Sequence, residues 1–197
     1  MSKNLTVAVM LLGVFTTSAS ASDFDIRPYI SAKVGIGTVE VAGSDFAPIG
    51  LTYSGVAGAN IKTEFINLRA EFEYQDLSAS HTISELSMSS VVTNSRLQVD
   101  ANFYKTNVYI DFLENYSLKP YVGFGFGLGR FNENLAVNNI SMGDVSDTGF
   151  TYSLYTGLGF QIFRGLYGDI GAFYNNTSIF NTNIETIGGT AGLRYNF

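Results

Sequence analysis

Apolar and polar residues alternate with a period of two along most of this chain, and no other sequence feature constrains its fold as strongly. In the clearest run, 65–75, five apolar residues alternate without error with five polar ones. The apolar set is Ile66, Leu68, Ala70, Phe72 and Tyr74. Because successive side chains of a β-strand point to opposite faces, this run predicts a strand with one apolar and one polar face. A helix would scatter the same apolar residues around its surface.

Eight such runs follow one another along the chain. They cover 29–38, 52–61, 65–75, 100–112, 121–130, 150–162, 166–174 and 188–197. The connections between them are alternately long and short, and the long ones are 43–50, 76–99, 131–149 and 175–183. We interpret the long connections as loops because they are rich in polar residues. The rhythm predicts an all-β fold, an eight-stranded antiparallel up-and-down barrel with both termini at the end of the short turns.

The first 21 residues are typical of a secretory signal peptide. Lys3 precedes an apolar run from Leu5 to Phe15, and Ala19-Ser20-Ala21 forms a small-residue cleavage site. We therefore expect residues 1–21 to be removed and residues 22–197 to form the barrel. The apolar run is about half the roughly 20 residues of a transmembrane helix, and no later segment comes closer. Any insertion into a membrane must then use strands.

Composition excludes several other classes of protein. The net charge of −6 and the lack of a clustered basic patch disfavour nucleic acid as a partner. The absence of cysteine removes disulfides, Cys-ligated zinc and thiol nucleophiles. The chain has no Trp, which lowers the lipocalin alternative, because a Trp near the first strand is usual in those soluble eight-stranded barrels.

The apolar face of the last run predicts contact with lipid. Ala191, Leu193, Tyr195 and Phe197 share that face, which in a transmembrane β-barrel meets lipid, with the final aromatic residue at the headgroup boundary. Aromatic residues of the other apolar faces gather near the two strand ends. Those at the turn end are Phe112, Phe160 and Phe197, and those at the loop end are Phe72, Tyr74, Tyr104, Phe150, Tyr152 and Tyr174. Two aromatic girdles of this kind are typical of a membrane barrel.

Three segments, Ile66–Tyr74, Lys119–Gly127 and Gly192–Phe197, resemble the small bacterial outer-membrane β-barrel family. This group includes the transmembrane domain of outer-membrane protein A, the neisserial opacity and surface proteins, and barrels labelled porin family. The resemblance implies a Gram-negative outer-membrane location and contact with outer-membrane lipid and lipopolysaccharide. It also implies an insertion signal in the last strand, formed by Leu193, Tyr195 and Phe197, that the barrel-assembly machinery binds.

Charged residues on the inward faces balance one another. The four cations are Lys33, Arg69, Lys105 and Arg194, and the four acids are Glu71, Glu73, Asp111 and Asp169. An eight-stranded barrel is just wide enough to be filled by its own side chains, so we expect a charge network that plugs the lumen. Lys33 is expected to face the glycines of the opposite strand, Gly123, Gly125, Gly127 and Gly129. The rival interpretation is a gated pore in which the same charges exchange partners.

These observations favour a structural and surface-display role, like that of an antigen or adhesin. The long connections 76–99 and 131–149 are the expected contacts for host or other cell-surface ligands. The alternative is a low-conductance, porin-like channel for small solutes. The two functions differ in whether the lumen is open.

Enzymatic activity, a cofactor and a metal site are all not expected. His81 is the only histidine, and the Ser-rich segment around it, with Glu85 nearby, reflects composition rather than a catalytic arrangement. Asp144 and Asp147 lack the spacing of a calcium-binding loop. The glycine series of 121–130 alternates strictly and leads into no helix, so it is not a phosphate-binding loop.

Overall fold

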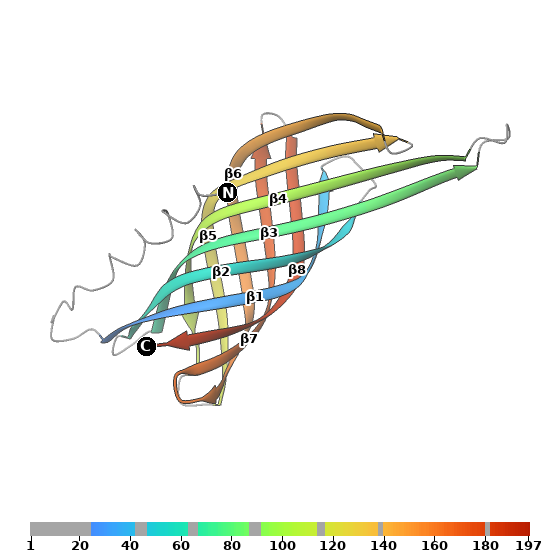
Figure 1. The fold of residues 1–197 in the computed structure, drawn as a ribbon. Helices are drawn as coiled ribbons and strands as arrows, with labels where there is room; N and C mark the ends of the chain where they lie inside the picture. Colours follow the sequence, from blue (N-terminus) through green and yellow to red (C-terminus); the bar gives the residue numbers. More distant parts are fainter. Residues whose placement is uncertain are drawn as a thin grey trace, which may run out of the picture.

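The protein is a closed antiparallel barrel of eight strands (Figure 1). The computed structural model describes residues 25–41, 47–62, 67–86, 92–113, 117–137, 140–179 and 182–197. Within these ranges the strands are β1 (Asp25–Val41), β2 (Ile49–Lys62), β3 (Asn67–Leu86), β4 (Val92–Asp111), β5 (Leu118–Val137), β6 (Ile140–Phe163), β7 (Leu166–Ile179) and β8 (Thr182–Asn196). Each strand pairs with its neighbours in sequence, and β1 pairs with β8. The predicted fold is confirmed. The described residues contain no helix long and apolar enough to cross a membrane.

The first and last strands close the barrel. Their register runs from Tyr29 opposite Asn196 to Val41 opposite Ile184. The strand β1 begins at Asp25, four residues before the start predicted at residue 29, and therefore includes Pro28. Pro28 is tolerated because its backbone faces the last residue of the chain: its carbonyl accepts a hydrogen bond of 3.1 Å from the Phe197 amide. No ladder bond is lost where β8 ends.

The connection between β6 and β7 is the tight turn that the sequence predicts. Only Arg164 and Gly165 separate the two strands. Gly165 has φ +83°, a left-handed conformation that glycine adopts at little cost. Its carbonyl accepts a hydrogen bond of 2.8 Å from the Asn196 amide, which ties this turn to the end of β8.

Three of the four long loops predicted at the opposite end, 76–99, 131–149 and 175–183, are mostly strands, so the prediction is wrong for them. In the fourth, 43–50, residues 43–46 lie outside the described residues. The strand β3 continues to Leu86 before β4 begins at Val92, and β5 continues to Val137 before β6 begins at Ile140. Likewise β7 ends at Ile179 and β8 begins at Thr182. The alternation persists in these segments but is inverted, since apolar residues such as Leu77 point inward and polar residues point outward. Their polar outward faces made them resemble loops.

The outer parts of β3 to β6 form a four-stranded sheet, here called the projecting sheet, that extends beyond the other strands (Figure 1). Pairing of β2 with β3 ends at Gly50 opposite Ala79, whereas β3 and β4 stay paired to Leu86 opposite Val92. Pairing of β6 with β7 begins only at Phe150 opposite Ser178. Two edges of this sheet, 80–86 in β3 and 140–149 in β6, therefore have no strand partner among the described residues.

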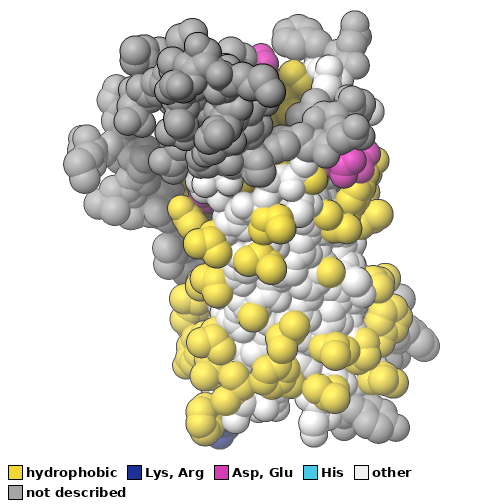
Figure 2. Space-filling view, turned by 90° about the vertical axis from the view of Figure 1, so that its right-hand side faces the viewer, with side chains coloured by type: hydrophobic (Ala, Val, Ile, Leu, Met, Phe, Trp, Pro, Cys, Tyr) yellow, Lys and Arg dark blue, Asp and Glu magenta, His cyan; other side chains and the backbone are white. Residues whose placement is uncertain are grey.

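Apolar side chains cover the outward face of the barrel wall (Figure 2). Phe124, Phe126 and Leu128 on β5 are about half exposed, as are Ile30 on β1 and Leu193 on β8. A water-soluble protein would not expose so continuous a band. The aromatic residues expected at the two ends lie on this outward surface. Its composition is that of a surface in contact with lipid.

Candidate functional site

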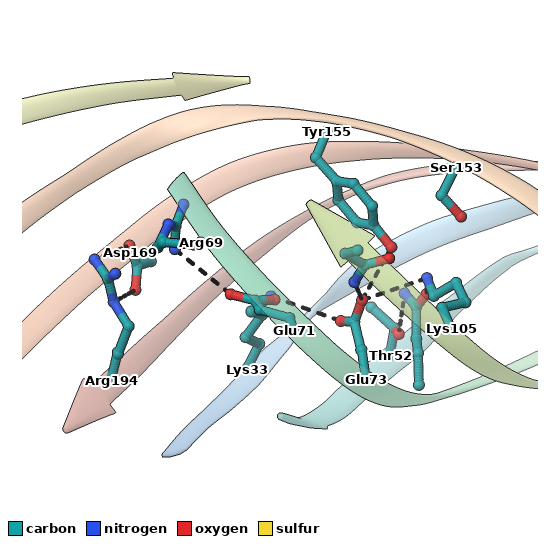
Figure 3. A network of polar contacts seen from close by, with 12 residues as sticks. Lys33, Thr52, Arg69, Glu71, Glu73, Lys105, Ser153, Tyr155, Asp169 and Arg194 are labelled. Atoms are coloured by element: carbon teal, nitrogen blue, oxygen red, sulfur yellow. Dashed lines mark hydrogen bonds and ion pairs between the residues drawn. The ribbon is translucent and has the colours of Figure 1, made fainter. Parts of the chain in front are cut away.

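The middle of the lumen holds an interlocked set of charges from three strands (Figure 3). Alternation in β3 places Glu71 and Glu73 on the same inward face. Lys33 Nζ from β1 lies 3.3 Å from Glu71 Oε2 and 3.7 Å from Glu73 Oε1. Lys105 Nζ from β4 lies 3.5 Å from Glu73 Oε2 and has no exposed surface. Glu73 is therefore held between two lysines, one on each side of its own strand.

Neutral donors complete the coordination of the two glutamates. Glu73 Oε2 accepts hydrogen bonds from Asn107 Nδ2 at 2.8 Å and from the Tyr155 hydroxyl at 2.9 Å. Glu71 Oε1 accepts one from the Tyr29 hydroxyl at 2.5 Å. Buried carboxylates need partners of this kind, because desolvation is costly for any charge left without them.

Arg69 links these glutamates to the turn end of the barrel. Its Nε lies 2.9 Å from Asp111 Oδ2 and its Nη1 lies 3.5 Å from Glu71 Oε1. The guanidinium carbon is 4.6 Å from the ring centroids of both Tyr109 and Tyr121. A cation held against two aromatic faces and two carboxylates has little freedom to move. Arg69 is accordingly 3% exposed.

Arg194 and Asp169 form a separate pair closer to the turn end. Arg194 Nε lies 3.2 Å from Asp169 Oδ2, and its Nη2 donates to Asp169 Oδ1 at 3.3 Å. Its guanidinium carbon lies 5.4 Å from the Tyr29 ring and 5.1 Å from the Tyr167 ring. The structure thus places all eight sequence-predicted charges inside the barrel. Six of them are connected, and Arg194 with Asp169 stands apart.

The glycines of β5 do not receive Lys33, so that expectation is wrong. A Cβ at Gly123 would collide with the Tyr109 ring, and one at Gly125 would collide with Asn107. The space is taken by side chains of the adjacent strand β4. Lys33 turns instead toward the carboxylates of β3, because an ammonium gains more from two acids within 4 Å than from an uncharged wall.

A layer of uncharged polar side chains lies on the outer side of the charge network. Lys105 Nζ donates to Gln75 Oε1 at 2.6 Å and to Asn175 Oδ1 at 3.2 Å. Asn175 Nδ2 in turn donates to Thr186 Oγ1 at 2.9 Å, and Ser153 Oγ donates to Asn175 Oδ1 at 2.7 Å. Sequence reasoning missed Asn175, which it assigned to a loop. The inward parity of β7, which continues from Asp169 through Phe173, is the signal that could have found it.

An apolar cluster, here called the apolar cap, fills the interior beyond this polar layer. Its members are 0–7% exposed and come from β1, β3, β4, β5, β7 and β8. They are Val39, Leu77, Ala79, Val99, Ala101, Phe103, Phe131, Ile179 and Ile184. The Phe103 and Phe131 rings meet edge to face with centroids 5.6 Å apart. Sequence reasoning missed the cap because five of these residues fall in segments interpreted as loops.

The opposite end of the lumen holds a pocket of about 100 Å³, here called the inner-mouth pocket. Residues of seven strands line it. The lining includes Asp25, Arg27, Asn60, Lys62, Asp111, Lys119, Tyr167 and Arg194. The interior therefore differs at its two ends, with closely packed apolar side chains at one and a polar recess at the other.

The residues of the proposed insertion signal point outward from β8 and the chain end. Leu193, Tyr195 and Phe197 are 54%, 48% and 68% exposed, and the last two rings meet edge to face at 5.4 Å. His81 lies in β3 opposite Leu97, and its side chain is outside those that the structure describes. The expectations of an insertion signal and of no catalytic site stay predictions.

Comparison with known proteins identifies the barrel. The sequence model of the outer membrane protein beta-barrel domain family matches residues 7–197. The chain belongs to this family. No curated protein sequence matches it. Among solved structures, this outer-membrane barrel is similar to Neisserial surface protein A, with a TM-score of 0.60, 18% identity and coverage of 86% of this chain and 97% of that one.

A second similar structure is Ail, the attachment invasion locus protein of Yersinia pestis, in complex with the heparin analogue sucrose octasulfate. The TM-score is 0.52 at 16% identity, over 87% of this chain and 99% of that one. At such identities the likeness concerns the fold. The family places this outer-membrane barrel in the outer membrane, where its apolar band meets lipid. Short turns of such barrels face the periplasm, so the projecting sheet and the apolar cap lie at the cell-surface end.

Proposed function

We propose that this protein is a plugged barrel that presents the projecting sheet at the cell surface, where the sheet contacts other macromolecules as an adhesin or surface antigen does. The observation that carries this proposal is a filled barrel that bears a sheet whose two edges have no strand partner among the described residues. The barrel anchors and orients the sheet, and the sheet supplies the contact surface.

The filled interior supports the plug. A solute that crossed the lumen would have to part the apolar cap and then the ion pairs around Glu73 and Arg69. Each pair compensates buried charge, so separating the partners is costly. The channel alternative therefore requires two unrelated layers to open together.

The edge of β3 supports contact with other chains. Natural proteins blunt exposed edges with Lys or Pro, yet residues 80–86 contain no Lys, Arg or Pro. An exposed edge offers a row of backbone donors and acceptors to an added strand. We propose that an extended polypeptide segment pairs with β3 in this way.

Charge at the cell-surface end favours a basic or uncharged partner. Figure 2 shows acidic side chains at the upper end of one face and a basic side chain at the lower end. Counting only the side chains that the structure describes in the outer parts of the strands, five are acidic and Arg130 is the one cation. The acids are Glu40, Asp76, Asp100, Asp147 and Glu185. Such a surface repels polyanions, so the sulfated ligand of the Ail complex is not carried over to this chain.

Shortening the β3–β4 hairpin tests the proposal. Ser80 pairs with Gln98, so residues 81–97 can be replaced by a two-residue Asn-Gly turn while the closed wall below stays paired. Cells or vesicles that carry the variant should lose adhesion to host-cell surfaces and to antibodies raised against the folded protein. A matched variant with two residues inserted at the periplasmic turn 164–165 should keep both. Undiminished adhesion of the shortened barrel would remove the display role.

A further inference from the structure

We infer that the inner-mouth pocket binds a small oxyanion, a phosphate or carboxylate group, that reaches it from the periplasmic side. This site is separate from the projecting sheet and does not depend on the display function. It is carried by the shape of the lumen, by a local surplus of positive charge, and by two cations arranged around one aromatic ring.

The lumen opens toward the periplasm and is filled at the cell-surface end. The apolar cap occupies the outer end with side chains that are at most 7% exposed. The pocket at the inner end leads from the solvent-exposed Arg27 and Lys62 to the buried Arg194. A ligand of this pocket therefore enters from the periplasm. Its volume of about 100 Å³ suits a group of a few heavy atoms and not a polymer chain.

The pocket is a positive region of an acidic protein. Four cations line it, Arg27, Lys62, Lys119 and Arg194, against the two acids Asp25 and Asp111. Both acids are already engaged: Asp25 Oδ2 lies 2.5 Å from Arg27 Nη2, and Asp111 Oδ2 lies 2.9 Å from Arg69 Nε. The lining therefore has four cations against two acids, in a chain whose net charge is −6. A concave site of one sign concentrates ions of the other.

Tyr167 brings two of these cations together. Lys119 Nζ lies 5.5 Å from the centroid of its ring, and the Arg194 guanidinium carbon lies 5.1 Å from it. Lys119 has no acid within 4 Å among the described residues, so its ammonium keeps its donors for a ligand. Arg194 is 5% exposed; its Nη2 donates to Asp169 Oδ1 at 3.3 Å and its Nη1 to Asn60 Oδ1 at 3.4 Å, whereas its buried Nε has no hydrogen-bond partner among the described residues. An oxyanion between these groups would gain charge-assisted hydrogen bonds from Lys119, whose ammonium group can bind phosphate as a point charge.

Titration of the refolded full chain tests the site. In a maltoside detergent, which contributes no phosphate, inorganic phosphate and acetate are added separately while binding is followed by calorimetry and by amide NMR shifts. We expect saturable binding, with shifts confined to residues around Tyr167 and Lys119. Lys119→Gln should weaken binding at least tenfold. The matched variant Arg130→Gln, at the outer end of the same strand, should leave it unchanged.

Two lipid compositions separate the sources of the oxyanion. In nanodiscs of phosphatidylglycerol, a headgroup that occupies the pocket would abolish the response to added phosphate, whereas in phosphatidylcholine nanodiscs the response would remain. A response that is equal in both lipids identifies a soluble periplasmic anion. Either result supports the site. Absence of saturable binding in maltoside, or binding of equal strength in Lys119→Gln with its barrel intact by circular dichroism, would overturn the proposal.

Discussion

The membrane-embedded wall and the projecting part of the same strands use opposite faces for their apolar residues. In β3, Phe72 and Tyr74 point outward while Glu73 points inward. A few residues later Ser78 points outward, and Leu77 is fully buried inside. The period of two is unbroken, so the strand has not changed its geometry. What has changed is the solvent, which is lipid around the wall and water around the extension.

The inversion of the pattern marks the membrane boundary, and different interactions stabilise the regions on its two sides. Inside the wall, polar groups must pair with one another, so the interior is a network of ion pairs and hydrogen bonds. Inside the projecting part, burial of apolar side chains stabilises the apolar cap, as it does in a water-soluble barrel. The most destabilising substitution should therefore remove a charged residue from the interior of the wall and an apolar residue from the interior of the projecting part. The measurement in each case is the free energy of unfolding of the refolded barrel in urea.

Removing one member of the wall network should have the largest effect. Arg69→Ala leaves Asp111 and Glu71 buried with one partner fewer and empties the space between Tyr109 and Tyr121. We expect a loss of about 3–5 kcal/mol. The matched control Arg130→Ala, on the exposed face of the projecting part, should change stability by less than about 0.5 kcal/mol. Equal stability of Arg69→Ala and the native protein would argue against a stabilising network.

Truncating an aromatic residue of the apolar cap should come next. Phe131→Ala opens a cavity beside Phe103, and we expect a loss of about 3–4 kcal/mol. Phe124→Ala on the same strand removes a side chain that faces lipid, where acyl chains fill the space. That variant loses only the transfer term, about 1.5–3 kcal/mol. A larger loss for Phe124→Ala would mean that the closely packed apolar residues lie on the lipid-facing side of the wall and not in the apolar cap.

Charge on the outward face should distinguish the two regions directly. Phe124→Arg places a guanidinium in lipid and should cost about 2–4 kcal/mol, because Phe124 lies midway along the apolar part of β5. Asn132→Arg, eight residues along the same face, should stay within about 0.5 kcal/mol of the native stability. Similar losses in both variants would mean that the membrane extends further along β5 than the inverted pattern indicates.

Sequence patterns predict the faces of the strands well and the contacts between them poorly. Alternation assigns Lys33, Glu73 and Lys105 to the interior because it needs only the parity of each residue. It does not tell which residues meet, since that depends on the stagger between strands. Lys33 meets Glu71 and Glu73 on β3 instead of the glycines of β5 for this reason.

The apolar cap shows a second limit. Leu77, Val99 and Phe131 lie in segments whose outward residues are polar, and a polar segment between two strands resembles a loop. Their inward parity was readable from the sequence. It was missed because the pattern of a membrane-embedded strand assigns apolar residues to the outward face along its whole length.

The smallest effect is expected for two glycines that differ in the space available for a Cβ. A Cβ at Gly127 would collide with the Tyr104 carbonyl oxygen, whereas a Cβ at Gly55 would meet nothing within 4 Å. We expect Gly127→Ala to cost about 1–3 kcal/mol and Gly55→Ala to be neutral or slightly stabilising. Equal effects of the two variants would show that the β4–β5 wall is less closely packed than described.

Single-channel recording in a planar lipid bilayer tests the plugged lumen most directly. The native protein should give no discrete current steps, and Arg69→Ala should also be silent, because the apolar cap still fills the outer end when the charge network is broken. Discrete steps in the native protein that become larger in Arg69→Ala would contradict this account and would identify a channel gated by its interior charges.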